Sequence, residues 1–250
     1  MDPSFYKEYF ELERAHWWFL ARRNIITSLI ERFIGVPHGQ TIFDAGCGSG
    51  FFVRYLQKMG YQAAGADGFG PAVDYGRQQQ GIQGISIMDQ EKIDAPDASY
   101  DCVLALDVLE HLEDETKMIR EMKRVLKPGG IMIVTVPAYR FLWGVQDTVA
   151  HHFRRYVRGE IVDTVVRGGG VRPIFSSYYN SLLFVPIAAV RLLFRWFHID
   201  TQRHSDYEIG PAWVNSLLYW IFNCEAYLLR LMSFPFGVSI VVVLKKLPRS

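Results

Sequence analysis

Thr41-Ile42-Phe43-Asp44-Ala45-Gly46-Cys47-Gly48-Ser49-Gly50 is the stretch of sequence that decides the fold of this chain. An apolar, β-prone run ends in an acid, three glycines follow at every second position, and residues 51–59 then read as a helix. A strand that turns through glycine into a helix is the geometry of nucleotide-binding loops in α/β sheets. Glycine permits positive φ angles and lets the backbone approach a ligand closely. The stretch therefore predicts a ligand-binding loop at the edge of an α/β sheet.

The spacing of this loop narrows the class of ligand. It lacks the Gly-Lys-Ser/Thr ending of a triphosphate site, and it departs from the Gly-x-Gly-x-x-Gly fingerprint of dinucleotide sites. Here the pattern is Asp-x-Gly-x-Gly-x-Gly, with the carboxylate of Asp44 before the first glycine. A carboxylate repels a pyrophosphate and suits a ligand that carries an ammonium or sulfonium charge.

Length, charge and cysteine usage limit the number of domains, the kind of partner and the redox environment. A chain of 250 residues fits one domain with an elaboration, and a formal net charge of +1 provides no global field for nucleic acid. The three cysteines form no Cys-x-x-Cys pair, which predicts a reducing, cytoplasmic environment without disulfides or a zinc site. The first residues lack a basic segment followed by an apolar one, so we expect no secretory signal.

Acids follow the carboxyl ends of four predicted strands. They are Asp44, Asp67, Asp89 and Asp107. Five predicted strands alternate with helices up to residue 137, which predicts a parallel sheet covered on both faces, with the ligand at the carboxyl ends of its strands. Asp67 occupies the position at which a carboxylate holds a ribose diol, and Asp89 is placed to accept from an adenine amine.

Several of these motifs together resemble one enzyme family. The run 43–50, the Asp67 position, the run from Tyr100 to Leu112 and the turn 126–130 are similar to class I S-adenosylmethionine (SAM) dependent methyltransferases of the ubiquinone/menaquinone-type, type 11/12-like group, over roughly residues 40–137. The resemblance implies a Rossmann-like α/β sheet of seven strands, mostly parallel with the last strand antiparallel, and SAM as cofactor.

The resemblance also implies a role for each matching position. It places the methionine part of SAM against Asp44 and the loop, the ribose at Asp67 with Gly68, the adenine near Asp89, and the sulfonium beside Leu106 and Asp107. The loop residues carried over in this way are Ala45, Gly46, Cys47, Gly48 and Gly50.

The segment before the glycine loop is rich in aromatic residues. Residues 4–34 read as helical, and they contain His16-Trp17-Trp18-Phe19 followed by Arg22-Arg23. One interpretation is a helix that packs its aromatics on the domain. The other is a lid formed by residues 1–39, with Trp18 against the cofactor, because two adjacent tryptophans cannot both face one helical core stripe.

A second polar motif, His151-His152-Phe153-Arg154-Arg155-Tyr156, follows the fifth strand. We interpret His152 as the base that deprotonates an acceptor hydroxyl, with His111 as the second choice. Arg155 or Tyr156 would then position an anionic or polar substrate. The alternative is a structural loop in which the arginines pair with acids. No cysteines or carboxylates stand at metal-ligand spacing, so we expect no metal.

The last two predicted strands, residues 171–179 and 238–244, are separated by far more chain than a hairpin needs. The sequence thus predicts a core of residues 40–179 and 237–250, interrupted by an apolar helical insertion at 180–236. Neither of its uncharged runs reaches the roughly 18 residues that span a bilayer. Three interpretations stay open: a cap with its apolar face buried, a lid over a greasy substrate, or a contact with a membrane surface or a second copy. Its excess of Phe, Trp and Leu favours a lipophilic substrate or contact with the inner face of a membrane.

The function predicted from these features is SAM-dependent methyl transfer to a small, lipophilic acceptor, as O-methylation with His152 as base. Transfer to carbon or nitrogen is an alternative. Two other classes stay open: a non-catalytic SAM- or nucleoside-binding or membrane-associated module, and a nucleotide-sugar or NAD enzyme, which the glycine spacing disfavours.

Overall fold

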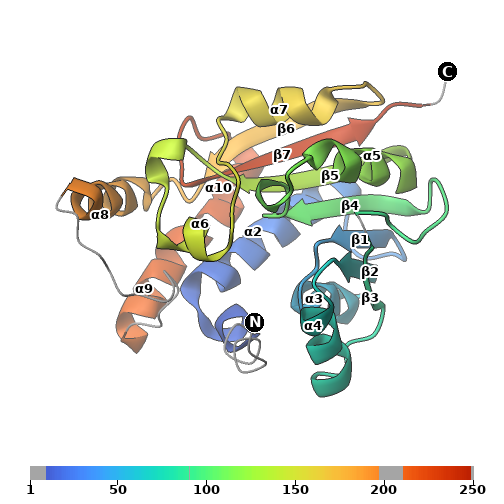
Figure 1. The fold of residues 1–250 in the computed structure, drawn as a ribbon, viewed down its shortest axis with the longest axis horizontal. Helices are drawn as coiled ribbons and strands as arrows, with labels where there is room; N and C mark the ends of the chain where they lie inside the picture. The colour runs from blue at the N-terminus through green and yellow to red at the C-terminus, as the bar shows by residue number, and fades with distance from the viewer. Residues whose placement is uncertain (1–9, 90, 197–210, 249–250) are drawn as a thin grey trace.

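The computed structural model of the chain describes residues 10–89, 91–196 and 211–248. Among these residues, one sheet of seven strands has the order β3-β2-β1-β4-β5-β7-β6 (Figure 1). β1 to β5 pair in parallel, whereas β7 is antiparallel to both β5 and β6. The predicted fold class is therefore confirmed. The strands are β1 Thr41–Ala45, β2 Gln62–Asp67, β3 Ile85–Ile87, β4 Tyr100–Leu106, β5 Leu126–Pro137, β6 Val171–Tyr179 and β7 Ser239–Lys246.

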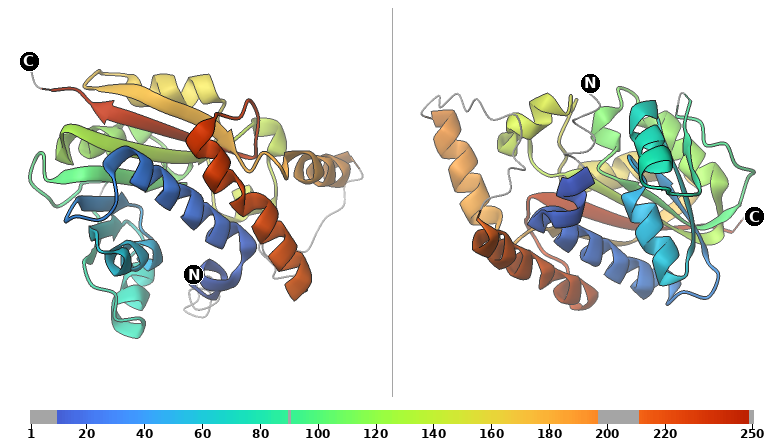
Figure 2. Two further views of the ribbon diagram at one scale, coloured as in Figure 1. Left: turned by 180° about the vertical axis from the view of Figure 1, so that it is seen from behind. Right: turned by 90° about the horizontal axis from the view of Figure 1, so that it is seen from below.

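Helices cover both faces of this sheet (Figure 2). One face carries α2 Trp17–Ile34, α3 Phe51–Met59, α9 Ala212–Asn223 and α10 Glu225–Leu231. The other carries α5 Glu115–Val125 and α7 Arg158–Val166. The remaining elements are α4 Gly70–Asp74, the π-helical turn η1 Tyr75–Gln79, the 3-10 turns η2 Leu109–His111 and η3 Arg140–Leu142, α6 Val145–Val149, and α8 Phe184–Trp196.

The core follows from the two-residue period of the strands. Along β5, Ile131 and Ile133 join the apolar cluster on the α2 side, and Met132 and Val134 join the cluster on the α5 side. A strand that is buried on both faces must be apolar at every position, and this explains the unbroken apolar run.

The predicted continuous helix over residues 4–34 is wrong at His16, where the helix is interrupted. His16 is the N-cap of α2, and its Nδ1 accepts a hydrogen bond of 3.3 Å from the amide of Trp18. Burial lowers the pKa of His16 to about 4, so the ring is neutral at pH 7 and keeps the lone pair that caps the helix. Residues 1–9 of the predicted lid lie outside the described residues.

Two further boundaries differ from the sequence prediction. The sequence also predicts a helix over residues 71–80, and the structure divides it into α4 and η1; a Cβ on Gly76 would come within 2.0 Å of the Ser49 carbonyl oxygen. The predicted turn at 127–130 is a bulge inside β5, since Leu126 pairs with Tyr100 and Ile131 already pairs with Cys102. Glycine allows both features: at Gly76 the missing Cβ permits the close approach to Ser49, and at Gly129 the bulge has a φ of 79°.

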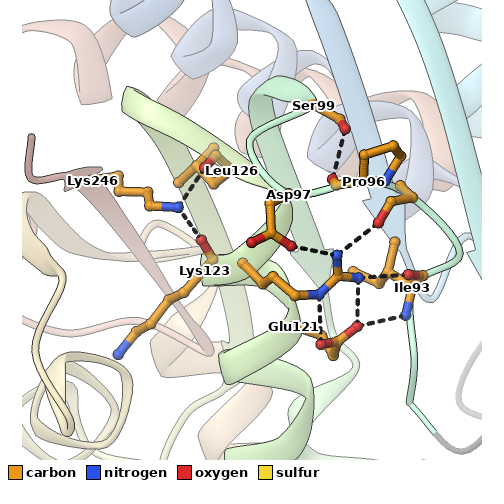
Figure 3. A network of polar contacts seen from close by, with 10 residues as sticks. Ile93, Pro96, Asp97, Ser99, Glu121, Lys123, Leu126 and Lys246 are labelled. Atoms are coloured by element: carbon orange, nitrogen blue, oxygen red, sulfur yellow. Dashed lines mark hydrogen bonds and ion pairs between the residues drawn. The ribbon is translucent and has the colours of Figure 1, made fainter. Parts of the chain in front are cut away.

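A polar network holds together the end of the sheet at which β4 begins (Figure 3). The Arg124 guanidinium donates to both oxygens of Glu121, to Asp97 at 3.1 Å and to the carbonyl of Ile93 at 2.7 Å. These contacts fasten the segment before β4 to α5. Because this network lies at the amino end of β4, it leaves the carboxyl ends of the strands free to form a site.

The insertion packs on α2 through the polar side of α9, contrary to a cap that buries its apolar stripe. Trp17 donates its amide to Asn215 Oδ1 at 2.9 Å, and Asn24 donates to Asn223 Oδ1 at 2.8 Å. The large apolar side chains of α9 are exposed instead, with Trp213 at 70% and Trp220 at 64% of their full accessibility. Within the described ranges, we find no helix with the length and apolar character needed to cross a membrane.

Candidate functional site

A cavity of about 790 Å³ lies at the carboxyl ends of β1, β2 and β4. Most of the residues predicted for the site line it: Trp18, Asp44, Gly46, Cys47, Gly48, Asp67, Gly68, Asp89, Leu106, Asp107, His111, His152 and Arg155. Three predicted residues are absent from this lining: Ala45, Gly50 and Tyr156. The fold thus brings together acids and histidines that are scattered over the sequence.

The glycine loop is shaped by close contacts. Gly46 has a φ of 84°, and a Cβ there would lie 2.4 Å from a methyl carbon of Val108. Gly50 has a φ of 78°, and a Cβ on it would collide with Ile85. Gly50 is therefore needed to pack the turn, and Ala45 is fully buried in the core on the α5 side. Both support the loop from beneath the cavity.

One end of the cavity is acidic; we call Glu13, Asp44 and Asp67 the acidic end. Burial raises the pKa of Asp44 to about 7, although the charge of Arg22 opposes this. The Oδ1 of Asp44 is buried and has no hydrogen-bond partner in the part of the chain that the structure describes. Asp67 accepts from the amides of Gly48 and Phe69, each at 2.7 Å. A concentration of carboxyl groups of this kind fits a cationic ligand.

Glu13 belongs to the acidic end but was missed in the sequence. It comes from the helical turn before α2, and it accepts a hydrogen bond of 2.8 Å from the Ser49 hydroxyl. Burial raises its pKa to about 7. The only signal for Glu13 in the sequence is an acid close to the aromatic motif. Its contact with the glycine loop depends on the interruption of the helix at His16, which the sequence prediction did not include.

The two adjacent tryptophans have different surroundings. Trp17 packs against Phe222 of α9, with ring centroids 5.8 Å apart. Trp18 lines the cavity, and the Arg22 guanidinium lies 5.1 Å from its ring centroid. Arg22 also forms an ion pair of 2.6 Å with Asp107, and so α2 is joined to the end of β4. Trp17 thus packs on the domain, as one interpretation of this motif predicts, while Trp18 lines the cavity, as the other predicts.

A buried Asp–His pair lies in the loop after β5. His152 Nδ1 is 2.8 Å from Asp147 Oδ1, and Asp147 is completely buried. Arg155 donates to both oxygens of Asp147, at 2.7 and 2.9 Å, and Gly144 donates its amide at 2.7 Å. Burial by itself raises the pKa of Asp147, but the hydrogen bonds from His152 and Arg155 outweigh it and hold that pKa well below its ordinary value.

The surroundings of Arg155 and Tyr156 do not match direct substrate positioning. The Arg155 guanidinium is occupied by Asp147 and by the carbonyl of Ala138 at 2.8 Å, so it positions the loop. The Tyr156 ring is 2% exposed and lies in the core on the α5 side. Because Tyr156 pairs with Ala138 in extended backbone, consecutive side chains point to opposite sides, and Tyr156 turns away from the cavity.

The Asp–His pair meets a second histidine at the end of β4. The rings of His111 and His152 are edge to face, with centroids 4.5 Å apart. His111 Nδ1 lies 2.9 Å from the carbonyl oxygen of Ala150, and burial lowers the pKa of His111. Glu110 next to it is fully buried, and burial raises its pKa well above the ordinary value. We call Glu110, His111 and His152 the histidine end.

Comparisons with known proteins bear on this geometry. Residues 43–134 match the family model described as a methyltransferase domain. The chain contains a class I SAM-dependent methyltransferase domain. A probable SAM-dependent methyltransferase of Mycolicibacterium smegmatis is 29% identical over 126 residues, which are 50% of this chain and 48% of that protein.

One further relative and one solved structure also resemble this methyltransferase domain. The malonyl-[acyl-carrier protein] O-methyltransferase of Serratia marcescens is 30% identical over 43% of this chain and 44% of that protein. The crystal structure of a SAM-dependent methyltransferase from Aquifex aeolicus superposes with a TM-score of 0.53 at 22% identity, covering 71% of this chain and 93% of that one, and so supports the fold. The chain spans about half the length of the first curated relatives that it matches.

The residues of the methyltransferase domain fit its cofactor, SAM. Asp44 lines the cavity, its buried Oδ1 has no hydrogen-bond partner among the described residues, and Glu13 and Asp67 add further carboxyl groups to the same lining. SAM carries a sulfonium and an ammonium group, and both are cations that such a site would stabilise. The tight fit of Gly46 on Val108 keeps the loop backbone beside that charge.

Proposed function

We propose that this chain transfers a methyl group from SAM to the hydroxyl oxygen of a small, lipophilic acceptor. One observation carries the proposal: a single cavity joins an acidic end suited to the cationic cofactor to a buried Asp147–His152 pair suited to a proton acceptor. The O-methyltransferase named among the relatives supports this choice of acceptor atom.

In this proposal the acidic end holds the cofactor. Asp44 and the backbone of the loop around Gly46, Cys47 and Gly48 would hold the methionine part, while Asp67 with Gly68 would accept from the ribose hydroxyls. Asp89, exposed at the rim, would lie by the adenine, Leu106 and Asp107 would flank the sulfonium, and Trp18 would close one wall. SAM supplies a methyl group that is already activated for displacement.

His152 is the proposed base. Asp147 can only accept hydrogen bonds while ionised, so the proton of the His152 ring is on Nδ1 and the lone pair is on Nε2. His152 Nε2 would take the proton of the acceptor hydroxyl as the acceptor oxygen attacks. SAM would supply the methyl group, and the electron pair of its methyl carbon–sulfur bond would stay on sulfur. Asp147 stabilises the imidazolium that forms, and His111 is the second candidate for this role.

The insertion supports the lipophilic part of the proposal. Large apolar side chains of α9 and α10 are exposed, with Leu231 at 84%. In the second view of Figure 2, α8 and α9 extend beyond the sheet. We propose that this surface contacts the inner, cytoplasmic face of a membrane, or a second copy of the chain, so that an apolar acceptor enters from it.

The test combines binding with transfer. Calorimetric titration should show SAM binding, and methyl-labelled SAM should then pass its label to hydroxylated apolar acceptors but not to their O-methylated analogues. If the label passes to matched amines or carbon acids instead, methylation of nitrogen or carbon would replace O-methylation in the proposal. SAM binding without transfer to any of these classes would favour the non-catalytic module, and tight NAD binding without SAM binding would overturn the proposal.

A further inference from the structure

We propose that Glu110, His111 and His152 bind one divalent transition-metal ion at the acceptor end of the cavity, with Zn²⁺ as the best-matched ion. One potential ligand atom from each of the three residues lies within 4.8 Å of the others. All three residues line the cavity. The sequence predicted no metal because no cysteines or carboxylates stand at metal-ligand spacing. Glu110 and His111 are adjacent, but His152 lies far along the chain from them, and η2 and the loop after α6 bring the three together.

The hydrogen bonds of the two histidines leave one nitrogen of each ring free to bind a metal. A carbonyl oxygen only accepts, so His111 donates from Nδ1 to Ala150 and keeps its lone pair on Nε2. The same reasoning leaves the lone pair of His152 on Nε2, opposite its bond to Asp147. Histidines that bind metals almost always donate the other ring N–H to a carboxylate or a backbone carbonyl. Both partners are present here.

Glu110 provides the observation that favours a cation over a simple histidine pair. Its side chain is fully buried, and neither carboxylate oxygen has a hydrogen-bond partner among residues 10–89, 91–196 and 211–248. The nearby cations Arg22 and Arg155 are bound to Asp107 and Asp147. A buried carboxylate beside two imidazole lone pairs is costly without a positive charge between them. A metal ion would balance all three groups.

The chemistry of the ligands indicates the kind of ion. Two imidazoles with one carboxylate are a frequent donor set for catalytic Zn²⁺ and for Fe²⁺, whereas Mg²⁺ prefers oxygen ligands. Three protein ligands leave coordination positions open toward the cavity. One of these would take the acceptor's hydroxyl oxygen, and the metal would favour its deprotonated form. The proton would then leave to water, because the Nε2 lone pair of His152 would be a metal ligand. This role rests on the methyl transfer of the proposed function, with the metal in place of His152 as the group that favours deprotonation; metal binding itself does not.

The experiment measures metal binding directly on the full chain. After removal of metals with EDTA, the protein is titrated calorimetrically with Zn²⁺ and with Mg²⁺, and Co²⁺ is added as a spectroscopic probe. We expect one Zn²⁺ per chain, much weaker Mg²⁺ binding, and a visible Co²⁺ spectrum of nitrogen and oxygen ligands. Glu110→Gln and His111→Asn should each weaken Zn²⁺ binding by about 100-fold or more, and Asp147→Asn by about 10–100-fold. His151→Asn is the matched control, because His151 is exposed, lies outside the cluster and has a φ of 55° that asparagine tolerates.

The outcomes separate this inference from the proposed function. Circular dichroism and SAM titration of each variant show that the fold and the cofactor site are intact. Zn²⁺ binding that is lost in the ligand variants but kept in His151→Asn supports the site, whether or not SAM binds. No stoichiometric Zn²⁺ binding to the wild type, or equal affinity in Glu110→Gln, overturns the metal site and leaves SAM-dependent transfer standing. Loss of transfer in His152→Ala alone, with Glu110→Gln fully active, would also overturn the metal's role and favour the imidazole base.

Discussion

The two ends of the cavity differ in how the chain builds them. Asp44 and Asp67 of the acidic end lie at the carboxyl ends of strands β1 and β2, and one glycine loop supplies backbone beside them. The histidine end combines η2, after β4, with a loop that follows β5 and α6, so that contacts across the fold decide its geometry. This difference indicates that cofactor binding and acceptor chemistry can be disturbed separately by substitution.

The largest expected effect falls on the histidine end. His152→Ala should lower methyl transfer by about 10²- to 10⁴-fold, because the acceptor hydroxyl loses the group that favours its deprotonation. The SAM dissociation constant should stay within about twofold of the wild type, since the acidic end is untouched. Single-turnover transfer and calorimetric SAM titration measure the two quantities. An equal loss of SAM affinity would mean that the two ends are not separable.

Asp44→Asn should weaken SAM binding, which His152→Ala should leave unchanged. Without the carboxylate charge, SAM affinity should fall by about 1–3 kcal/mol, which is roughly 5- to 150-fold. The cofactor-free protein should become more stable, because the substitution removes the charge of a buried carboxyl group whose Oδ1 has no hydrogen-bond partner among the described residues and whose burial raises its pKa to about 7. Chemical denaturation with and without SAM tests both statements. Unchanged SAM affinity would show that Asp44 does not face the cofactor.

The acidic end also predicts a dependence on pH. Burial raises the pKa values of Glu13 and Asp44 to about 7, above the ordinary values for the unfolded chain. Between about pH 4.5 and pH 7 the folded state therefore holds protons that the unfolded state has lost, so the free energy of unfolding of the cofactor-free protein should fall as the pH rises through this range.

SAM should reverse part of that trend. Its sulfonium cation is attracted more strongly once both carboxyl groups are ionised, so the rise in Tm that SAM produces should grow by a few degrees between about pH 5.5 and pH 7.5. S-adenosylhomocysteine, which lacks the sulfonium charge, is the control and should show a smaller increase. Equal increases for the two ligands would contradict an electrostatic role for the acidic end.

The sequence allowed the sheet and most of the acidic end to be predicted, since acids after apolar strands and glycines after an acid are local patterns. The seven strands and the antiparallel last strand agree with that prediction. Glu13 could not be found, because its contact with Ser49 requires the interruption at His16. Of the two predicted neighbours Arg155 and Tyr156, only Arg155 lines the cavity, and the extended pairing of Tyr156 with Ala138, which turns its ring away, cannot be read from the sequence.

The insertion was the least predictable region because its helices can present either face to the domain. The sequence shows that α9 has an apolar and a polar side, but the pairing partner is α2, whose Asn24 and Ser28 offer polar contacts. Hydrogen bonds to these residues hold the polar side of the insertion, and Phe222 and Leu229 supply its buried apolar contacts. Trp213, Trp220 and Leu231 are consequently left at the surface.

The smallest effect on the isolated protein is expected at that surface. Trp213→Ser combined with Trp220→Ser should change the free energy of unfolding by no more than about 0.5 kcal/mol per site, because both side chains are mostly exposed. SAM affinity should also be unchanged. If the insertion contacts a membrane, however, the same variant should lose most of its co-sedimentation with vesicles of anionic phospholipid, since exposed tryptophans supply apolar area at the interface.

Ile87→Ser in β3 is the matched control for this experiment, because Ile87 is a large apolar residue with 53% exposure outside the insertion. It should sediment with vesicles like the wild type. If neither the wild type nor Ile87→Ser binds vesicles, and the wild type instead forms a dimer that the double tryptophan variant cannot form, the surface joins two copies of the chain. In both cases the double tryptophan substitution would separate delivery of the acceptor from its chemistry, because the Asp147–His152 pair at the histidine end of the cavity would remain intact.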